Sequence, residues 1–172
     1  VFDTGGYNLK PTNSIETMQQ DMAGAAAVMG IFEILPKLGI KKNIIGITPI
    51  VENLVSSTAY RPADIITMLS GQTVEITNTD AEGRLILADA ITYGGRLNPE
   101  FMITIATLTG AVAVALGDRY AGILGNDFKV RKALVKAGRE VDELAWPLPL
   151  HQDYKKKMDS LYADMQNCDL GT

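Results

Sequence analysis

The stretch TVEITNTDAEGRLILADAITYGG, residues 73–95, determines how the fold is interpreted. Residues 73–78 alternate polar and apolar side chains, which predicts a β-strand with one buried face. Residues 81–93 have a strong helical pattern, and the glycines at 94 and 95 are a typical helix stop. A strand therefore leads through an acidic loop into a helix, as the units of an α/β fold do.

The rest of the chain continues this alternation. Helices are expected at 21–38 and 127–141, and strands at 43–51, 101–107 and 120–124. The runs at 43–51 and 101–107 are apolar on both faces, as in the central strands of a sheet that helices cover. We therefore predict an α/β fold with a largely parallel or mixed sheet sandwiched between helices.

Composition excludes several classes of protein. The 172 residues are 47% hydrophobic with a formal net charge of -4, and the densest basic run, 155–157, is too small for a nucleic-acid surface. No apolar run reaches the ~18–20 residues that cross a bilayer. The single cysteine, Cys168, excludes an intramolecular disulfide and favours a reducing compartment, the cytoplasm by default. With one histidine, His151, any metal must be held mainly by oxygen ligands.

Acidic residues stand at the ends of the expected elements. Asp3 follows an opening strand, Asp80 and Glu82 follow the strand at 73–78, and Asp21 begins the first long helix. Ligands of open α/β sheets bind beyond the carboxyl ends of the strands. Four carboxylates in such places fit a cage for divalent cations, and paired cations need bridging carboxylates.

Each of these residues also has a structural explanation. Residues 79–82 fit a capping box, which spacing alone favours. Arg84 would pair with Asp80 on a helix surface, Lys10 taken singly would be a solvated lysine, and His151 would cap a helix or face solvent. The sequence contains no nucleophile elbow, phosphate-binding loop or dinucleotide fingerprint, so those enzyme classes are excluded.

Four segments together resemble the catalytic domain of the leucyl aminopeptidase (cytosol aminopeptidase) family. They are FDTGGYNLK at 2–10, DMAGAAAV at 21–28, NTDAEGRL at 78–85 and ATLTGA at 106–111. They occur in the family's order and cover essentially the whole chain. The resemblance implies a metal-dependent aminopeptidase that uses a two-metal-activated water to remove N-terminal residues from peptides, with Leu-like residues preferred and broad specificity.

The same resemblance implies roles for individual residues. The expected metal ligands are Asp3, Asp21, Asp80, Glu82 and Lys10. The Lys10 ammonium would also polarise the scissile carbonyl and stabilise the oxyanion. Arg84 would hold a bicarbonate that relays a proton. The cofactors would be two divalent metal ions, zinc or manganese, with magnesium or cobalt as alternatives.

Substrate-binding residues follow from the motifs as well. They are Met18, Asn78, Thr107, Leu108 and Gly110. Met18 would line the apolar side-chain pocket, although core packing explains it nearly as well.

Two departures from the family pattern are visible. The family has a lysine metal ligand a few residues upstream of its first aspartate, and this chain begins after that point. The position two before Asp21, usually basic in the family, is Gln19.

The expected organisation is a partial catalytic metallopeptidase domain over residues 1–172, with upstream and downstream segments missing and no activity by itself. The expected partners are peptides with a free N-terminus and further copies of the chain in a hexamer, with no nucleic acid and no membrane. A DNA-binding or regulatory role and a silent scaffold role are the alternatives, and the negative charge counts against the first.

Overall fold

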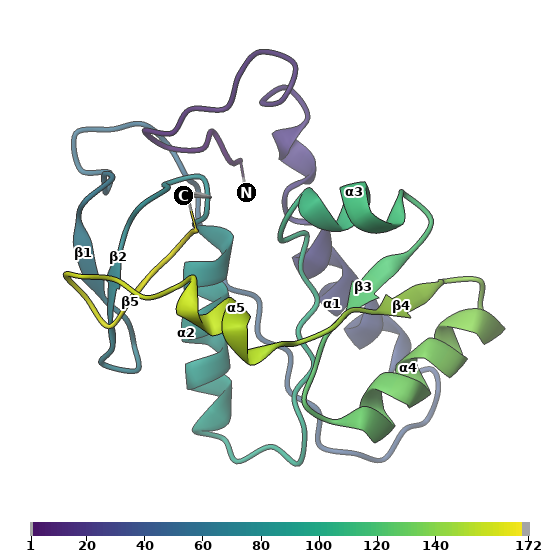
Figure 1. Cartoon of the computed structure of the whole chain (residues 1–172). Coiled ribbons are helices and arrows are strands. Elements are labelled where there is room, and N and C mark those ends of the chain that lie inside the picture. Colours follow the sequence, from purple (N-terminus) through teal and green to yellow (C-terminus); the bar gives the residue numbers. More distant parts are fainter. Residues whose placement is uncertain (1, 170–172) are drawn as a thin grey trace. The chain divides into compact units, whose positions relative to one another are not determined.

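A computed structural model describes residues 2–169 of the chain (Figure 1). The chain divides into two compact units. The first unit consists of Val1–Thr107 with Met158–Thr172, and the second is Leu108–Lys157.

A small mixed sheet forms the centre of the first unit. Its strands are β1 (Ile65–Thr67), β2 (Thr73–Glu75) and β5 (Met165–Gln166), in the order β1-β2-β5. Strand β2 pairs antiparallel with β1 and parallel with β5. The middle strand β2 is therefore hydrogen-bonded on both edges, and it leads directly into the loop at 76–82.

The core of the first unit lies where this sheet meets helix α2 (Gly83–Gly95). Val74 and Ile76 point into it from β2 and the residues that follow, and Leu85 packs against them from α2. Ile76 is fully buried, and residues 73–77 alternate between buried and half-buried. The predicted one-faced strand and the helix after it are thus confirmed.

Two of the predicted strands are wrong, because neither 43–51 nor 101–107 forms a strand. Pro49 removes a backbone donor from the first run. Among residues 2–169, neither run has a neighbouring strand with which to form a ladder.

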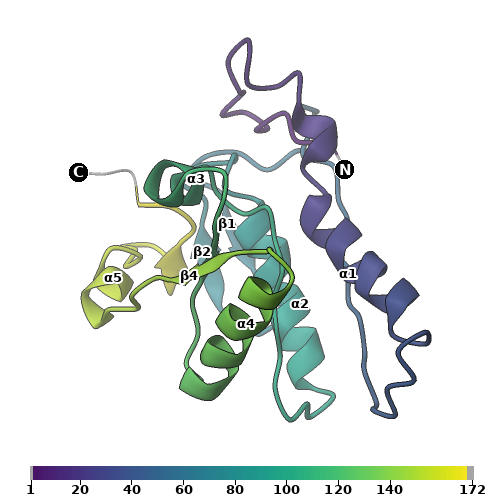
Figure 2. The ribbon, with the colours of Figure 1, turned by 90° about the vertical axis from the view of Figure 1, so that its right-hand side faces the viewer.

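Both runs pack on helix α1 (Ala23–Ile34), which follows a short 3-10 turn, η1 (Met18–Gln20). Figure 2 shows α1 beside the chain that returns after it. A Cβ on Gly46 would lie 2.6 Å from the Phe32 ring, and one on Gly24 would lie 2.6 Å from the Cα of Ala106. The two runs therefore pack against a helix, as predicted, but they do not form the β-sheet hydrogen bonds that were predicted with it.

The second unit contains a parallel strand pair with helices around it. Its elements are α3 (Ala111–Leu116), β3 (Ala121–Ile123), α4 (Phe128–Glu140), β4 (Ala145–Pro147) and α5 (Gln152–Lys156). Strand β3 pairs in parallel with β4, and the strand predicted at 120–124 and the helix predicted at 127–141 are confirmed.

His151 is the N-cap of α5, where its Nδ1 accepts a hydrogen bond from the Asp153 amide. The capping role predicted for this histidine is confirmed.

The mixed α/β class is confirmed, with one mixed and one parallel sheet. Among the described residues, no helix combines the length and the apolar character that a membrane span requires.

Candidate functional site

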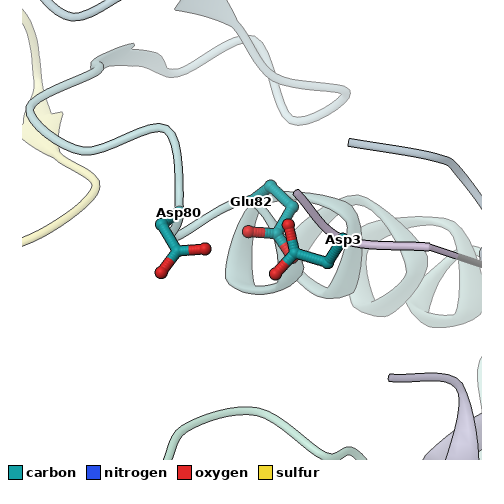
Figure 3. A group of neighbouring side chains, drawn as sticks. All are labelled: Asp3, Asp80 and Glu82. Carbon is teal, nitrogen blue, oxygen red and sulfur yellow. The ribbon is translucent and has the colours of Figure 1, made fainter. Parts of the chain in front are cut away.

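Asp3, Asp80 and Glu82 lie together in the first unit (Figure 3). One carboxylate oxygen of each lies within 4.8 Å of one oxygen of the others, which is close enough to hold a metal ion. Asp3 is buried, whereas the other two are partly exposed. Within residues 2–169, this is the one group of three such ligands that the structure forms.

The loop that carries Asp3 depends on two glycines. Gly5 and Gly6 have φ angles of 86° and 63°, a left-handed conformation that side chains disfavour. A Cβ on Gly5 would also lie 2.5 Å from the Asn8 carbonyl oxygen. The Gly5 amide donates to Asp3 Oδ1 at 2.8 Å, and the Lys10 amide donates to the Thr4 carbonyl at 2.9 Å. The tight turn thus returns Lys10 to the side of Asp3.

Thr79 joins this turn to the second acidic loop. Its hydroxyl donates to the Gly5 carbonyl at 2.6 Å and accepts from the Asn8 amide at 2.8 Å. The capping-box explanation is therefore wrong: α2 begins at Gly83, its N-cap is Glu82, and no side-chain capping bond is made. The threonine hydroxyl holds two loops together, and the Glu82 carboxylate joins the acidic group.

Lys10 lies inside the acidic group. Its Nζ is 2.8 Å from Asp3 Oδ2 and 2.6 Å from Asp80 Oδ1, and the side chain is 16% exposed. Burial alone lowers the pKa of Lys10, but hydrogen bonds to Asp3 and Asp80 outweigh it and raise the pKa. The solvated-lysine alternative is therefore wrong, because this ammonium is held by two carboxylates.

The pKa values of Asp80 and Glu82 are raised by burial and by the negative charge around them. Burial, followed by the charges of Asp3, Asp21 and Asp80, raises the pKa of Glu82 to about 7. Burial also raises the pKa of Asp80, against the opposing effect of Lys10. Carboxylates whose ionised form is disfavoured by burial, and then by neighbouring negative charge, are the groups that a bound cation would stabilise.

Asp21 lies beside the group of three rather than within it. It follows η1, and burial and then the charge of Asp3 raise the pKa of its carboxyl. The Thr107 side chain hydrogen-bonds to this carboxyl. The structure thus brings Thr107 to Asp21, and half-buried Met18 is the first residue of η1.

The other predicted site residues have different surroundings. Asn78 Oδ1 accepts from the Asp80 amide at 2.8 Å, which shapes the acidic loop. Arg84 Nη1 donates to the Asn167 carbonyl at 3.0 Å. Leu108 and Gly110 belong to the second unit, where Gly110 precedes α3. Their roles toward substrate, and that of Arg84 toward bicarbonate, stay predictions.

Two buried asparagines were not predicted from the sequence. Asn53 is 6% exposed and Asn167 is 2% exposed. The Asn167 side chain accepts from the Thr77 amide at 2.9 Å and donates to the Asn78 carbonyl at 2.7 Å, and so supports the loop before Asp80. No local pattern distinguishes either residue from an asparagine in an exposed loop.

The chain belongs to the cytosol aminopeptidase family, whose catalytic-domain model matches residues 1–172. It is 52% identical over 168 residues to a probable cytosol aminopeptidase of Agrobacterium fabrum, covering 97% of this chain and 34% of that protein. It is 51% identical over 167 residues to one of Saccharophagus degradans, covering 97% of the chain and 33% of that protein. A third probable cytosol aminopeptidase, from Phytoplasma australiense, is 49% identical over 172 residues, which cover 99% of this chain and 35% of that protein. The chain thus spans about a third of the length of the curated relatives it matches.

Proposed function

We propose that this chain is a partial catalytic domain of a metal-dependent aminopeptidase, which removes N-terminal residues from peptides and prefers Leu-like residues. The observation that carries the proposal is the group of Asp3, Asp80 and Glu82, of which the two aspartates contact the Lys10 ammonium. Membership of the cytosol aminopeptidase family supports peptidase chemistry. The relative from Agrobacterium fabrum is about three times as long as the part that it shares with this chain, so the activity of a whole enzyme is proposed here for the complete gene product.

The donor set fits divalent metal ions. All three grouped ligands are carboxylates, and a cation already lies between two of them in the form of the Lys10 ammonium. Asp3, Asp21, Asp80 and Glu82 would hold two ions, zinc or manganese with magnesium or cobalt as alternatives, and Lys10 would contact one of them. When bound, such ions supply Lewis-acid catalysis and a water of lowered pKa.

The residues of the chain would supply the remaining chemistry. Hydrogen bonds to Asp3 and Asp80 outweigh burial and raise the pKa of Lys10 in the metal-free protein, and its ammonium would donate to the oxyanion that develops at the scissile carbonyl. Such a positioned charge contributes ~3 kcal/mol or more to transition-state stabilisation. The Asn167 carbonyl holds one edge of the Arg84 guanidinium, which leaves other donors for a bicarbonate. An uncharged amino terminus of the substrate would be a further ligand for one of the ions, which would favour peptides with a free N-terminus.

The proposal extends to location and assembly. The relatives are named as cytosol aminopeptidases, and we propose the cytosol for this protein as well. A homo-hexamer is proposed from the resemblance of the four motifs to the family.

Site variants of the complete gene product that contains these 172 residues test the proposal. Asp80→Ala is expected to abolish hydrolysis of a leucine anilide, because it removes a shared ligand. Lys10→Ala is expected to lower kcat about 100-fold or more, as the loss of an oxyanion donor does. His151→Ala, which changes an exposed helix cap in the second unit, is the control and is expected to keep nearly full turnover. An Asp80→Ala enzyme with normal activity would overturn the metal-site assignment.

A further inference from the structure

We propose that Asn53 is a positioning residue that fixes which oxygen of Asp3 faces the metal site; this rests on the proposed function. The Asn53 side chain donates from Nδ2 to Asp3 Oδ1 and to the Thr79 carbonyl, both at 2.9 Å. Both N–H bonds of the carboxamide are thereby used. One side chain thus joins the loop of Asp3 to the loop of Asp80 and Glu82.

The two oxygens of Asp3 have different partners. Oδ1 accepts two neutral N–H donors, Asn53 Nδ2 at 2.9 Å and the Gly5 amide at 2.8 Å. Oδ2 is the oxygen that contacts the Lys10 ammonium, at 2.8 Å. Because Oδ1 is occupied by protein donors, Oδ2 is left for a cation. A carboxylate that is held at one oxygen in this way is oriented before the metal binds.

The backbone of Asn53 ties it to the same segment. Its carbonyl accepts from the Thr4 amide at 2.9 Å and from the Thr4 hydroxyl at 2.8 Å. Asp3 and Asn53 also form an isolated parallel β-bridge. The backbone contacts hold residue 53 beside Asp3 whatever its side chain is, so a substitution removes the carboxamide contacts without separating the two segments.

Charge explains why this contact matters. Asp3 is buried next to Asp80 and Glu82, and like charges at this distance repel one another. Without the Asn53 donor, Asp3 Oδ1 would keep the Gly5 amide alone, and rotation about the side-chain bonds would relieve the repulsion. Loss of a hydrogen bond that orients a metal ligand typically lowers metal affinity 10–100-fold.

Titration of the metal-stripped complete gene product with Co²⁺ tests the proposal. The change in affinity and the visible absorption of bound Co²⁺ are measured for the unsubstituted protein, Asn53→Ala and Asn53→Leu. We expect Asn53→Ala to bind Co²⁺ 10–100-fold more weakly and to shift its absorption bands, since the Asp3 ligand is no longer held in one orientation. Asn53→Leu keeps about the size of the side chain and lacks both N–H donors without adding a charge, so we expect a loss of similar size.

Ile76→Val is the matched control, because it lowers the stability of the same unit without touching Asp3. Its Co²⁺ affinity and spectrum are expected to equal those of the unsubstituted protein. If Asn53→Ala does not fold, as judged by circular dichroism, Asn53→Leu carries the test. Unchanged affinity and spectrum in a folded Asn53 variant would overturn the positioning role alone. Failure of the unsubstituted protein to bind Co²⁺ would overturn the proposed function.

Discussion

The two units of the chain differ in what they bury. The first unit buries polar residues as well as apolar ones, namely Asp3, Asn53, Thr79 and Asn167. In the second unit no residue is fully buried, and its structure rests on a parallel strand pair and an amphipathic helix capped by Asp127. The first unit thus buries a polar and charged group beside its apolar core, whereas the second buries none of its residues fully.

This difference shows what a charged centre requires. Buried polar groups are costly unless they are hydrogen-bonded, and the buried asparagines and threonine of the first unit all make such bonds. Even so, burial, followed by the charge of neighbouring acids, keeps the pKa values of Asp80 and Glu82 raised. The site of the first unit thus opposes the stability of the metal-free fold.

The largest expected effect is a loss of stability in the second unit when Gly138 is replaced. A Cβ at this position would collide with the Glu143 carbonyl oxygen, which is backbone and cannot move aside easily. Although Ala normally favours a helix over Gly, Gly138→Ala is expected to destabilise by about 2 kcal/mol. Amide hydrogen exchange across α4, in the complete gene product, measures this.

Gly30→Ala in α1 is the control, since nothing lies within 4 Å of its added Cβ. It is expected to stabilise its helix by about 0.5–1 kcal/mol. The same sign of effect at both positions would contradict the close approach at Gly138.

A smaller change in stability is expected in the first unit when the Glu82 carboxylate is removed. Since the pKa of Glu82 is raised from 4.5 to about 7, the metal-free fold favours its protonated form. The free-energy cost of ionising Glu82 in the folded protein is therefore absent below pH about 4.5 and grows as the pH rises to about 7. Glu82→Gln should stabilise the metal-free protein at pH near 8 by about 1–2 kcal/mol, a value reduced for the solvent that reaches this carboxylate.

Urea denaturation of the metal-free protein at pH near 8 and near 4.5 measures the Glu82 effect. The increase in the free energy of unfolding caused by Glu82→Gln should be present at pH near 8 and absent at pH near 4.5. An equal gain at both values would show that charge is not its cause.

The smallest effect concerns the cap of α4. Asp127 Oδ1 accepts from the amides of Lys129 at 2.7 Å and Val130 at 3.1 Å. Asp127→Ala is expected to destabilise the helix by about 1 kcal/mol, seen as faster hydrogen exchange in its first turns. Glu140→Ala is the control and removes a surface ion pair with Lys136. It should change the free energy of opening of the helix, as measured by hydrogen exchange, by less than about 0.5 kcal/mol. An equal effect of the two would argue against the cap.

Much of the site could be predicted from local sequence. Asp80 and Glu82 stand between a strand and a helix that their own patterns identify, and the acidic group contains both of them with Asp3. The amphipathic helix α4 was predicted for the same reason, since its apolar residues recur within a few positions.

The remaining features depend on contacts between residues far apart in sequence. The hydroxyl of Thr79 binds Gly5, 74 residues away, and this contact decides against the capping box. The carboxamide of Asn53 binds Asp3, 50 residues away. The runs at 43–51 and 101–107 show how apolar patterning predicts burial against a helix but leaves the partner for backbone hydrogen bonds undetermined.

The most direct test of the central claim is the metal dependence of leucine anilide hydrolysis by the complete gene product. Activity is measured before chelation, after removal of metal ions and after addition of Mn²⁺ or Zn²⁺. The account predicts that activity disappears on chelation and returns with metal in the unsubstituted protein, and that neither metal restores it to Asp80→Ala. Activity that survives the removal of metal from a folded protein, or that metal restores equally to Asp80→Ala, would contradict it.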